Sequence, residues 1–100
     1  MAKLVWSESA QFELDAIVDF IALDNKRAAF NYGRKVLSEL KFLNEFPELG
    51  KRLEEIPNRS DLRELVIPPC RVFYRYVDDE VHILHIMRSE RKLRLRNLER

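Results

Sequence analysis

Arginines are the residues in this sequence whose type and spacing best suit a chemical role. A guanidinium group stays charged and can hold a phosphate or a carboxylate through two parallel hydrogen bonds. Such a group could neutralise phosphates or meet an acidic segment of a protein partner. It could equally form solvated pairs with glutamates, which contribute little to stability. The candidates lie between residues 63 and 91: Arg63, Arg71, Arg75, Arg88 and Arg91.

Nucleophilic and metal chemistry have weaker support. Cys70 would need a nearby histidine to act as a nucleophile, and nothing in the sequence places it beside His82 or His85. The two histidines are separated by an odd number of residues in one predicted strand, so they should point to opposite faces. We therefore expect no metal site and no cofactor. A carboxylate cluster falls in a predicted turn, where solvation explains it: Asp78, Asp79 and Glu80.

Three apolar runs in the second half of the chain must position the arginines. The runs LRELVI, RVFYRYV and VHILHIM are separated by Pro68-Pro69 and by the acidic turn at residues 78–80. Short runs of β-branched and aromatic residues joined by tight turns are typical of consecutive strands. This stretch therefore predicts an antiparallel meander.

Alternation of side chains along the predicted strands places their arginines. Arg71 and Arg75 share one face of their strand with Phe73, while Arg63 shares a face of its own strand with apolar neighbours. Both faces of the strands carry apolar residues, so we expect both to be covered. Helices can cover one face. The other should be met by the chain's own C-terminal segment or by a separate protein.

The first half of the chain predicts two helices. Apolar residues recur at helical spacing over residues 10–21 and again over residues 29–43, and Asp24-Asn25 between them are good N-cap residues. Two helices joined this closely should form an antiparallel hairpin. A brief strand at residues 3–6 precedes the first helix. The second helix must end before Pro47, because proline lacks the amide donor.

Length and composition indicate one domain, residues 1–100, of the α+β class. One hundred residues with 46% hydrophobic content suffice for a single core. We expect a helical hairpin packed on a twisted, mainly antiparallel sheet of three to four strands. The formal net charge is only +1, yet residues 88–100 hold six basic and two acidic residues. This leucine-containing tail predicts a short C-terminal helix.

The same sequence indicates a cytoplasmic protein. A lone cysteine cannot form an internal disulfide, and the first residues lack the pattern of a signal peptide. No apolar run approaches the roughly 18 to 20 residues that cross a bilayer. Membrane insertion is therefore not expected.

Nearly the whole chain resembles the RelE/ParE superfamily of bacterial toxins from type II toxin–antitoxin pairs. The resemblance rests on the order and spacing of four stretches: LVWSESAQFELDAIVDFIA, DNKRAAFNYGRKVLSEL, FPELGKRL and RELVIPPCRVFYRYVDDEVHILHIMRSER. It implies two N-terminal helices on a twisted antiparallel sheet, in agreement with the fold expected from the residues. It also implies a cognate antitoxin protein as partner and a toxin–antitoxin hetero-oligomer.

The resemblance implies one of two activities. RelE-like members are ribosome-dependent mRNA interferases that use basic side chains on the sheet and usually a C-terminal Tyr or His. ParE-like members instead inhibit DNA gyrase. By the same resemblance, Arg63, Arg71 and either Arg88 or Arg91 match the basic positions of the nucleases. The expected tyrosine is replaced by Leu95, and such a loss removes about 10²- to 10⁴-fold from a proton-transfer step.

We therefore expect a ParE-like toxin that binds DNA gyrase and is occluded by its antitoxin, which would cover the apolar sheet face and the helical hairpin. The alternative is a RelE-like nuclease acting on mRNA at the ribosome, with His85 substituting for the tyrosine if it faces Arg63, Arg71, Arg88 and Arg91. A third possibility is a non-toxic scaffold of the same fold that only binds a partner. The expected target-binding residues are Arg63, Arg71, Arg75, Arg88, Arg91, Lys92 and Arg94.

Overall fold

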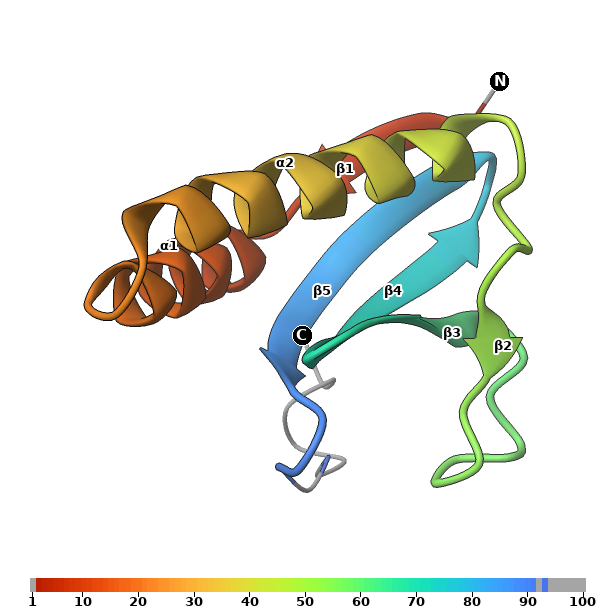
Figure 1. The fold of residues 1–100 in the computed structure, drawn as a ribbon. Helices are drawn as coiled ribbons and strands as arrows, with labels where there is room; N and C mark the ends of the chain where they lie inside the picture. Colours follow the sequence, from red (N-terminus) through yellow and green to blue (C-terminus); the bar gives the residue numbers. More distant parts are fainter. Residues whose placement is uncertain (1, 92, 94–100) are drawn as a thin grey trace.

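A two-helix hairpin lies against one face of a twisted sheet in the computed structural model, which describes residues 2–91 and residue 93 (Figure 1). The helices are α1 (Glu8–Ala22) and α2 (Lys26–Lys41), followed by the short 3₁₀ helix η1 (Phe42–Asn44). The strands are β1 (Lys3–Trp6), β2 (Lys51–Arg52), β3 (Leu62–Ile67), β4 (Cys70–Val77) and β5 (Glu80–Arg88). The α+β class and the helical hairpin are confirmed.

The sheet has five strands in the order β1-β5-β4-β3-β2, rather than three to four. Strands β3, β4 and β5 form the predicted antiparallel meander, and β1 adds in parallel beside β5. The additional strand, β2, pairs only two of its residues with β3. A strand this short has no measurable alternation of side chains, which is why the sequence did not indicate it.

The turn between β4 and β5 explains the acidic cluster. Asp78 and Asp79 have positive φ angles of 52° and 61°. Aspartate tolerates this left-handed conformation better than most residues, and two successive positive φ angles are typical of the tight hairpin turn called type I′. The cluster therefore belongs to the chain reversal, as expected.

Helix α1 is fixed to the sheet at both its start and its middle. The Ser7 side chain accepts a hydrogen bond from Ala10 N (3.0 Å) as the N-cap and donates to Leu84 O of β5 (2.9 Å). One turn further on, Glu13 accepts from Ile86 N (2.9 Å). These bonds meet β5 where its pairing with β4 is irregular, since Phe73 pairs with His85 and Tyr74 with Ile83.

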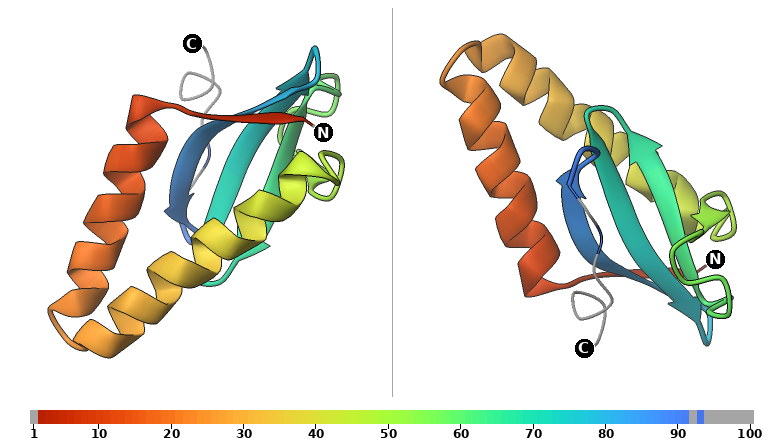
Figure 2. Two further views of the ribbon diagram at one scale, coloured as in Figure 1. Left: turned by 90° about the horizontal axis from the view of Figure 1, so that it is seen from above. Right: turned by 90° about the horizontal axis from the view of Figure 1, so that it is seen from below.

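The main core lies between the hairpin and the sheet. The helices contribute buried apolar residues, and the inward residues of β4 and β5 meet them: Ala10, Leu14, Tyr32, Val36 and Leu40 from the helices, and Val72, Tyr74, Val81, Ile83 and Ile86 from the strands. Figure 2 shows that the turn end of the hairpin projects beyond the sheet. Neither helix in the described part of the chain is long and apolar enough to cross a membrane.

A second, smaller core covers part of the opposite sheet face. Phe73 and Leu62 pack there with Leu53 from the preceding loop and with Leu93. Leu93 belongs to the C-terminal segment, so the expectation that this segment meets the second face is confirmed at that residue. The C-terminal helix was predicted over residues 88–100, but Arg88 ends β5 and residues 89–91 form a turn and a bend, so the prediction is wrong there. Residue 92 and residues 94–100 fall outside the described residues.

Candidate functional site

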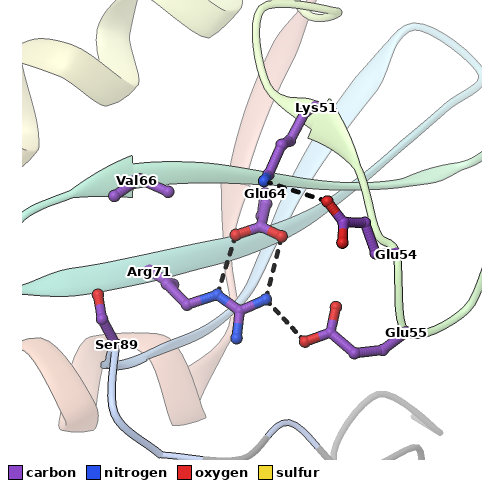
Figure 3. Close-up of a pocket in the computed structure, with 7 residues that line it drawn as sticks. All are labelled: Lys51, Glu54, Glu55, Glu64, Val66, Arg71 and Ser89. Carbon is purple, nitrogen blue, oxygen red and sulfur yellow. Dashed lines mark hydrogen bonds and ion pairs between the residues drawn. The ribbon is translucent and has the colours of Figure 1, made fainter.

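Arg71 is the centre of an ion-pair cluster on the sheet face opposite the helices (Figure 3). Its Nε lies 2.9 Å from Glu64 Oε1, and its Nη2 lies 3.0 Å from Glu64 Oε2 and 2.9 Å from Glu55 Oε2. Glu64 is only 4% exposed. The Arg71 guanidinium also stacks over the Phe73 ring, 4.7 Å from its centre. Two carboxylates and an aromatic ring therefore hold this side chain in place.

The groove around this cluster is not a positive surface. Three of its lining residues are acidic and two are basic: Lys51, Glu54, Glu55, Glu64, Val66, Arg71 and Ser89. The hydrogen bond to Glu64 raises the pKa of Arg71 further above its ordinary value. Burial is the largest single effect on the pKa of Glu55 and raises it, but the hydrogen bonds to Arg71 and to the backbone and the positive charges of Arg71 and Lys51 together leave that pKa below its ordinary value. A phosphate entering here would meet carboxylates whose charges already neutralise Arg71.

Arg63 lies on the other face of the sheet. It pairs in register with Tyr74, which points into the main core, whereas Arg71 pairs with Val66 on the groove side. The Arg63 guanidinium donates to Gly50 O (2.7 Å) and Glu48 O (3.3 Å), so it holds the loop that precedes β2. The two arginines therefore do not share a binding surface.

The remaining predicted arginines are also divided between the faces. Arg75 shares the Arg71 face, and its Nε is buried with no hydrogen-bond partner among the described residues. Arg88 pairs in register with Cys70 on the helix side, stacks over Phe20 of α1 at 5.7 Å and bonds Glu90 (3.0 Å). Arg91 is exposed just after β5, while Lys92 and Arg94 lie outside the described residues. A single arginine face is therefore not present in the described part of the chain.

The histidines and the cysteine do not join the arginine cluster. His85 pairs in register with Phe73, but its ring is held by Glu13 of α1, with Nδ1 3.1 Å from Glu13 Oε2, and it does not line the groove around Arg71. His82 contacts Glu80 instead (2.9 Å). Cys70 is fully buried, and burial raises the pKa of its thiol. No group of three potential metal ligands occurs within residues 2–91 or at residue 93.

The glutamates that hold Arg71 were not predicted from the sequence, although the position of one of them, Glu64, could have been. A two-residue turn at Pro68-Pro69 places Val66 opposite Arg71 and leaves Glu64 on the diagonal, within reach of a long side chain. The partner Glu64 was therefore predictable from the register of the hairpin. Glu55 was not, because it comes from an irregular loop with no pairing rule.

Comparison with known proteins agrees with this fold. Residues 4–93 match the family described as ParE toxin of type II toxin–antitoxin system, parDE. Toxin RelE2 of Caulobacter vibrioides is 34% identical over 92 residues, which are 91% of this chain and 99% of that protein. A chain of the chromosomal ParDE toxin–antitoxin system from P. aeruginosa is 26% identical with a TM-score of 0.73, over 90% of this chain and 98% of that one.

The family match extends over most of the chain, and the relatives in sequence and in structure agree with it. Membership also implies a cognate antitoxin as a binding partner. The protein therefore belongs to the RelE/ParE superfamily and is a toxin of a type II toxin–antitoxin system.

Proposed function

We propose that this toxin acts by binding DNA gyrase, as a ParE-like inhibitor, and that it does not cleave RNA. The observation that carries the proposal is the pairing of Arg71 with Glu64 and Glu55. Catalysis of phosphodiester cleavage requires positive groups aimed at the charge that develops in the transition state. In this groove the arginine is already neutralised, and extra carboxylates repel a phosphate.

No suitable proton donor lies near Arg71 in the described part of the chain, and this supports the same proposal. A general acid or base must come within hydrogen-bond reach of the proton it transfers. His85 is engaged by Glu13 of α1 and does not line the groove around Arg71. Among the described residues, the titratable side chains beside Arg71 are the glutamates that pair with it and the neighbouring Glu54 and Lys51.

The proposal assigns the target contacts to the basic side chains near the C-terminal end and on the adjoining strand: Arg75, Arg88, Arg91, Lys92 and Arg94. Arg63 and Arg71 then act mainly within the protein, because their guanidinium groups bind its own carbonyls and carboxylates. The antitoxin would cover the groove around Arg71, where Val66 is 48% exposed beside charged residues of both signs. An extended segment that covers such a groove would neutralise the toxin by occlusion.

A supercoiling assay tests the proposal. Purified toxin should inhibit DNA supercoiling by purified gyrase, and Arg91→Glu should weaken the inhibition because it reverses an exposed positive charge. Lys3→Glu, an exposed charge reversal on β1, serves as the matched control and should inhibit like the natural sequence. Normal supercoiling in a large excess of folded toxin would exclude gyrase as the target.

An mRNA interferase remains the second candidate, because the curated relative is named Toxin RelE2. This activity predicts cuts at defined codon positions in toeprinting on translating ribosomes, and those cuts should vanish in Arg71→Ala. The gyrase proposal predicts no cuts at toxin concentrations that stop growth. If neither assay responds and expression without the antitoxin leaves growth unaffected, the protein acts as a non-toxic scaffold.

A further inference from the structure

The two helices of the hairpin carry opposite charge. Helix α1 contains four acidic residues and no basic one, whereas α2 contains five basic residues and one acidic residue. None of the ion pairs among the described residues joins α1 to α2. The hairpin charges are therefore not used to hold the two helices together.

Helix stability does not explain this distribution. Negative charges favour the N-terminus of a helix and positive charges the C-terminus. Asp19 lies in the last turn of α1, and Lys26 and Arg27 lie in the first turn of α2, each at the less favourable end. The segregation of charge at the turn end of the hairpin opposes the helix dipoles, so it calls for another explanation.

Each charged helix also exposes large apolar side chains on the same side as its charges. Phe12 of α1 and Leu23, the C-cap residue of that helix, are 75% and 85% exposed, and they are spaced with Asp15 and Asp19 along one side of it. Together these four residues are called the acidic stripe. Their spacing of three and four residues keeps them on one face over about three turns.

Helix α2 carries the complementary pattern. Phe30 and Leu37 are 64% and 49% exposed, and they alternate along one side with Arg34 and Lys41, which are also exposed. These four residues are called the basic stripe. The Arg34 guanidinium stacks over the Phe30 ring at 5.7 Å.

Both stripes belong to the surface of the hairpin that faces away from the sheet. Tyr32 of α2 points to the sheet, where it donates to Ile67 O (2.6 Å), and Gly33 faces Val18 of α1 at 3.6 Å for an added Cβ. Around the circumference of α2, the side that faces the sheet is followed by the side that faces α1 and then by the basic stripe. Around α1, the side of Glu13 at the sheet is followed by the side of Val18, which faces α2, and then by the acidic stripe. The hairpin lies as an outer layer on the sheet (Figures 1 and 2).

We propose that this outer hairpin surface binds a second copy of the chain through a two-fold axis parallel to the helices. Such an axis places the acidic stripe of each copy against the basic stripe of the other and repeats the contact twice. A two-fold axis across the helices would instead oppose like charges. The exposed phenylalanines and leucines would then be buried at the centre of the contact.

The neighbouring charges favour a second copy over other occupants. Nucleic acid or an anionic lipid surface would be attracted to the basic stripe but repelled by Asp15 and Asp19 beside it. The chain itself supplies a surface complementary to both stripes. The proposal is independent of the toxin's target and assigns this surface to a toxin dimer instead of the antitoxin.

Two charge-reversed variants of the full chain test the dimer. The first, Asp15→Lys with Asp19→Lys, makes both stripes basic, and the second, Arg34→Glu with Lys41→Glu, makes both acidic. Sedimentation equilibrium should show the natural chain as a dimer of its 12.0 kDa protomer. Each variant alone should associate at least about tenfold more weakly. An equimolar mixture should recover a 1:1 dimer of about the natural affinity, because each stripe again meets its opposite.

Controls separate this result from misfolding and from antitoxin binding. Glu54→Lys, an exposed reversal beside the Arg71 groove, should dimerise like the natural chain, and circular dichroism should show all variants folded. Dimerisation should weaken as salt rises, because exposed charges are screened. A natural chain that is monomeric at about 100 μM would overturn the proposal. Variants that dimerise normally, or a mixture of folded variants that stays monomeric, would also overturn it. The proposal would also be overturned if the toxin is a monomer and the charge-reversed variants no longer bind the antitoxin. That result would assign the surface to the antitoxin.

Discussion

Gly50 is the more tightly enclosed of the two glycines. A Cβ added there would lie 2.5 Å from Glu64 O and 2.7 Å from Tyr74 Oη. The Tyr74 hydroxyl accepts from Gly50 N (2.8 Å) and donates to Pro47 O (2.9 Å), while Arg63 donates to Gly50 O. These bonds fasten residues 47–50 to the sheet. They leave no volume for a side chain at residue 50.

The two glycines should respond oppositely to alanine. Gly50→Ala forces a methyl group against backbone and should lower the free energy of unfolding by about 1–3 kcal/mol. Gly33→Ala would place its methyl group 3.6 Å from Val18 Cγ2, an ordinary contact, and should raise that free energy by up to about 1 kcal/mol, because alanine favours the helix. Urea unfolding of both variants measures the difference. An equal effect at the two sites would contradict it.

Helix α1 contacts β5 where the sheet is irregular, and this contact joins the hairpin to the sheet. The register of β4 with β5 shifts by one residue between Phe73 and Tyr74, so Leu84 of β5 has no partner residue on β4. The Ser7 side chain donates to Leu84 O and the Glu13 side chain accepts from Ile86 N. Side chains of α1 and its N-cap therefore satisfy backbone groups of β5 there. His85 lies at the same irregularity, where Glu13 contacts its ring, and it does not line the groove around Arg71.

Removing the Glu13 acceptor should therefore destabilise the fold. Glu13→Ala leaves Ile86 N without this partner and should cost about 1–3 kcal/mol in the free energy of unfolding. Glu13→Gln retains an acceptor oxygen and should cost clearly less. Gln11→Ala, at an exposed position on the same helix and outside the acidic stripe, is the control. Chemical denaturation of the three variants tests the order, and similar losses in Glu13→Ala and Gln11→Ala would disprove the role of the bond.

The loop before β3 should make stability depend on acid pH. The hydrogen bonds of Arg59 to Asp61 (both 3.0 Å) hold the pKa of Asp61 below its ordinary value, and Arg71 lowers that of Glu55 against the opposing effect of burial. Carboxylates with lowered folded pKa values stabilise the protein above their unfolded values. This contribution is lost as pH falls below about 4.5 and through the folded pKa values.

Paired measurements can isolate this contribution. Glu55→Gln combined with Asp61→Asn should reduce the fall in unfolding free energy between about pH 6 and pH 3, because the two groups no longer titrate. Lys35→Gln, which changes an exposed charge on α2, should keep the natural pH dependence. An unchanged fall in the double variant would show that other groups determine acid unfolding.

In the whole molecule the net charge is small, but positive and negative side chains are concentrated on different elements. The sheet arginines are distributed over both faces, and Arg71 is neutralised by glutamates. Charges of one sign gather instead on each helix of the hairpin, negative on α1 and positive on α2. The supercoiling assay and the mixing of charge-reversed variants therefore examine different surfaces, and either result can stand without the other.

Much of this architecture was predictable because it follows from local patterns. The apolar spacing over residues 10–21 and 29–43 determined the helices, and the runs between residues 62 and 87 determined the meander. The family resemblance rested on the same stretches, and the match over residues 4–93 confirmed it. The two-residue strand β2 and the parallel pairing of β1 were not predictable, because both depend on distant partners.

The sequence by itself determined the two helices, the meander, the toxin family and the positions of the arginines along the chain. Only the tertiary structure decided which groups face one another. Arg63 and Arg71 lie on opposite faces because their strands pair in a defined register, and Glu55 reaches Arg71 because an irregular loop folds across the sheet. Side-chain chemistry is a property of each residue, whereas neutralisation of a charge requires a partner that folding alone brings within about 3 Å.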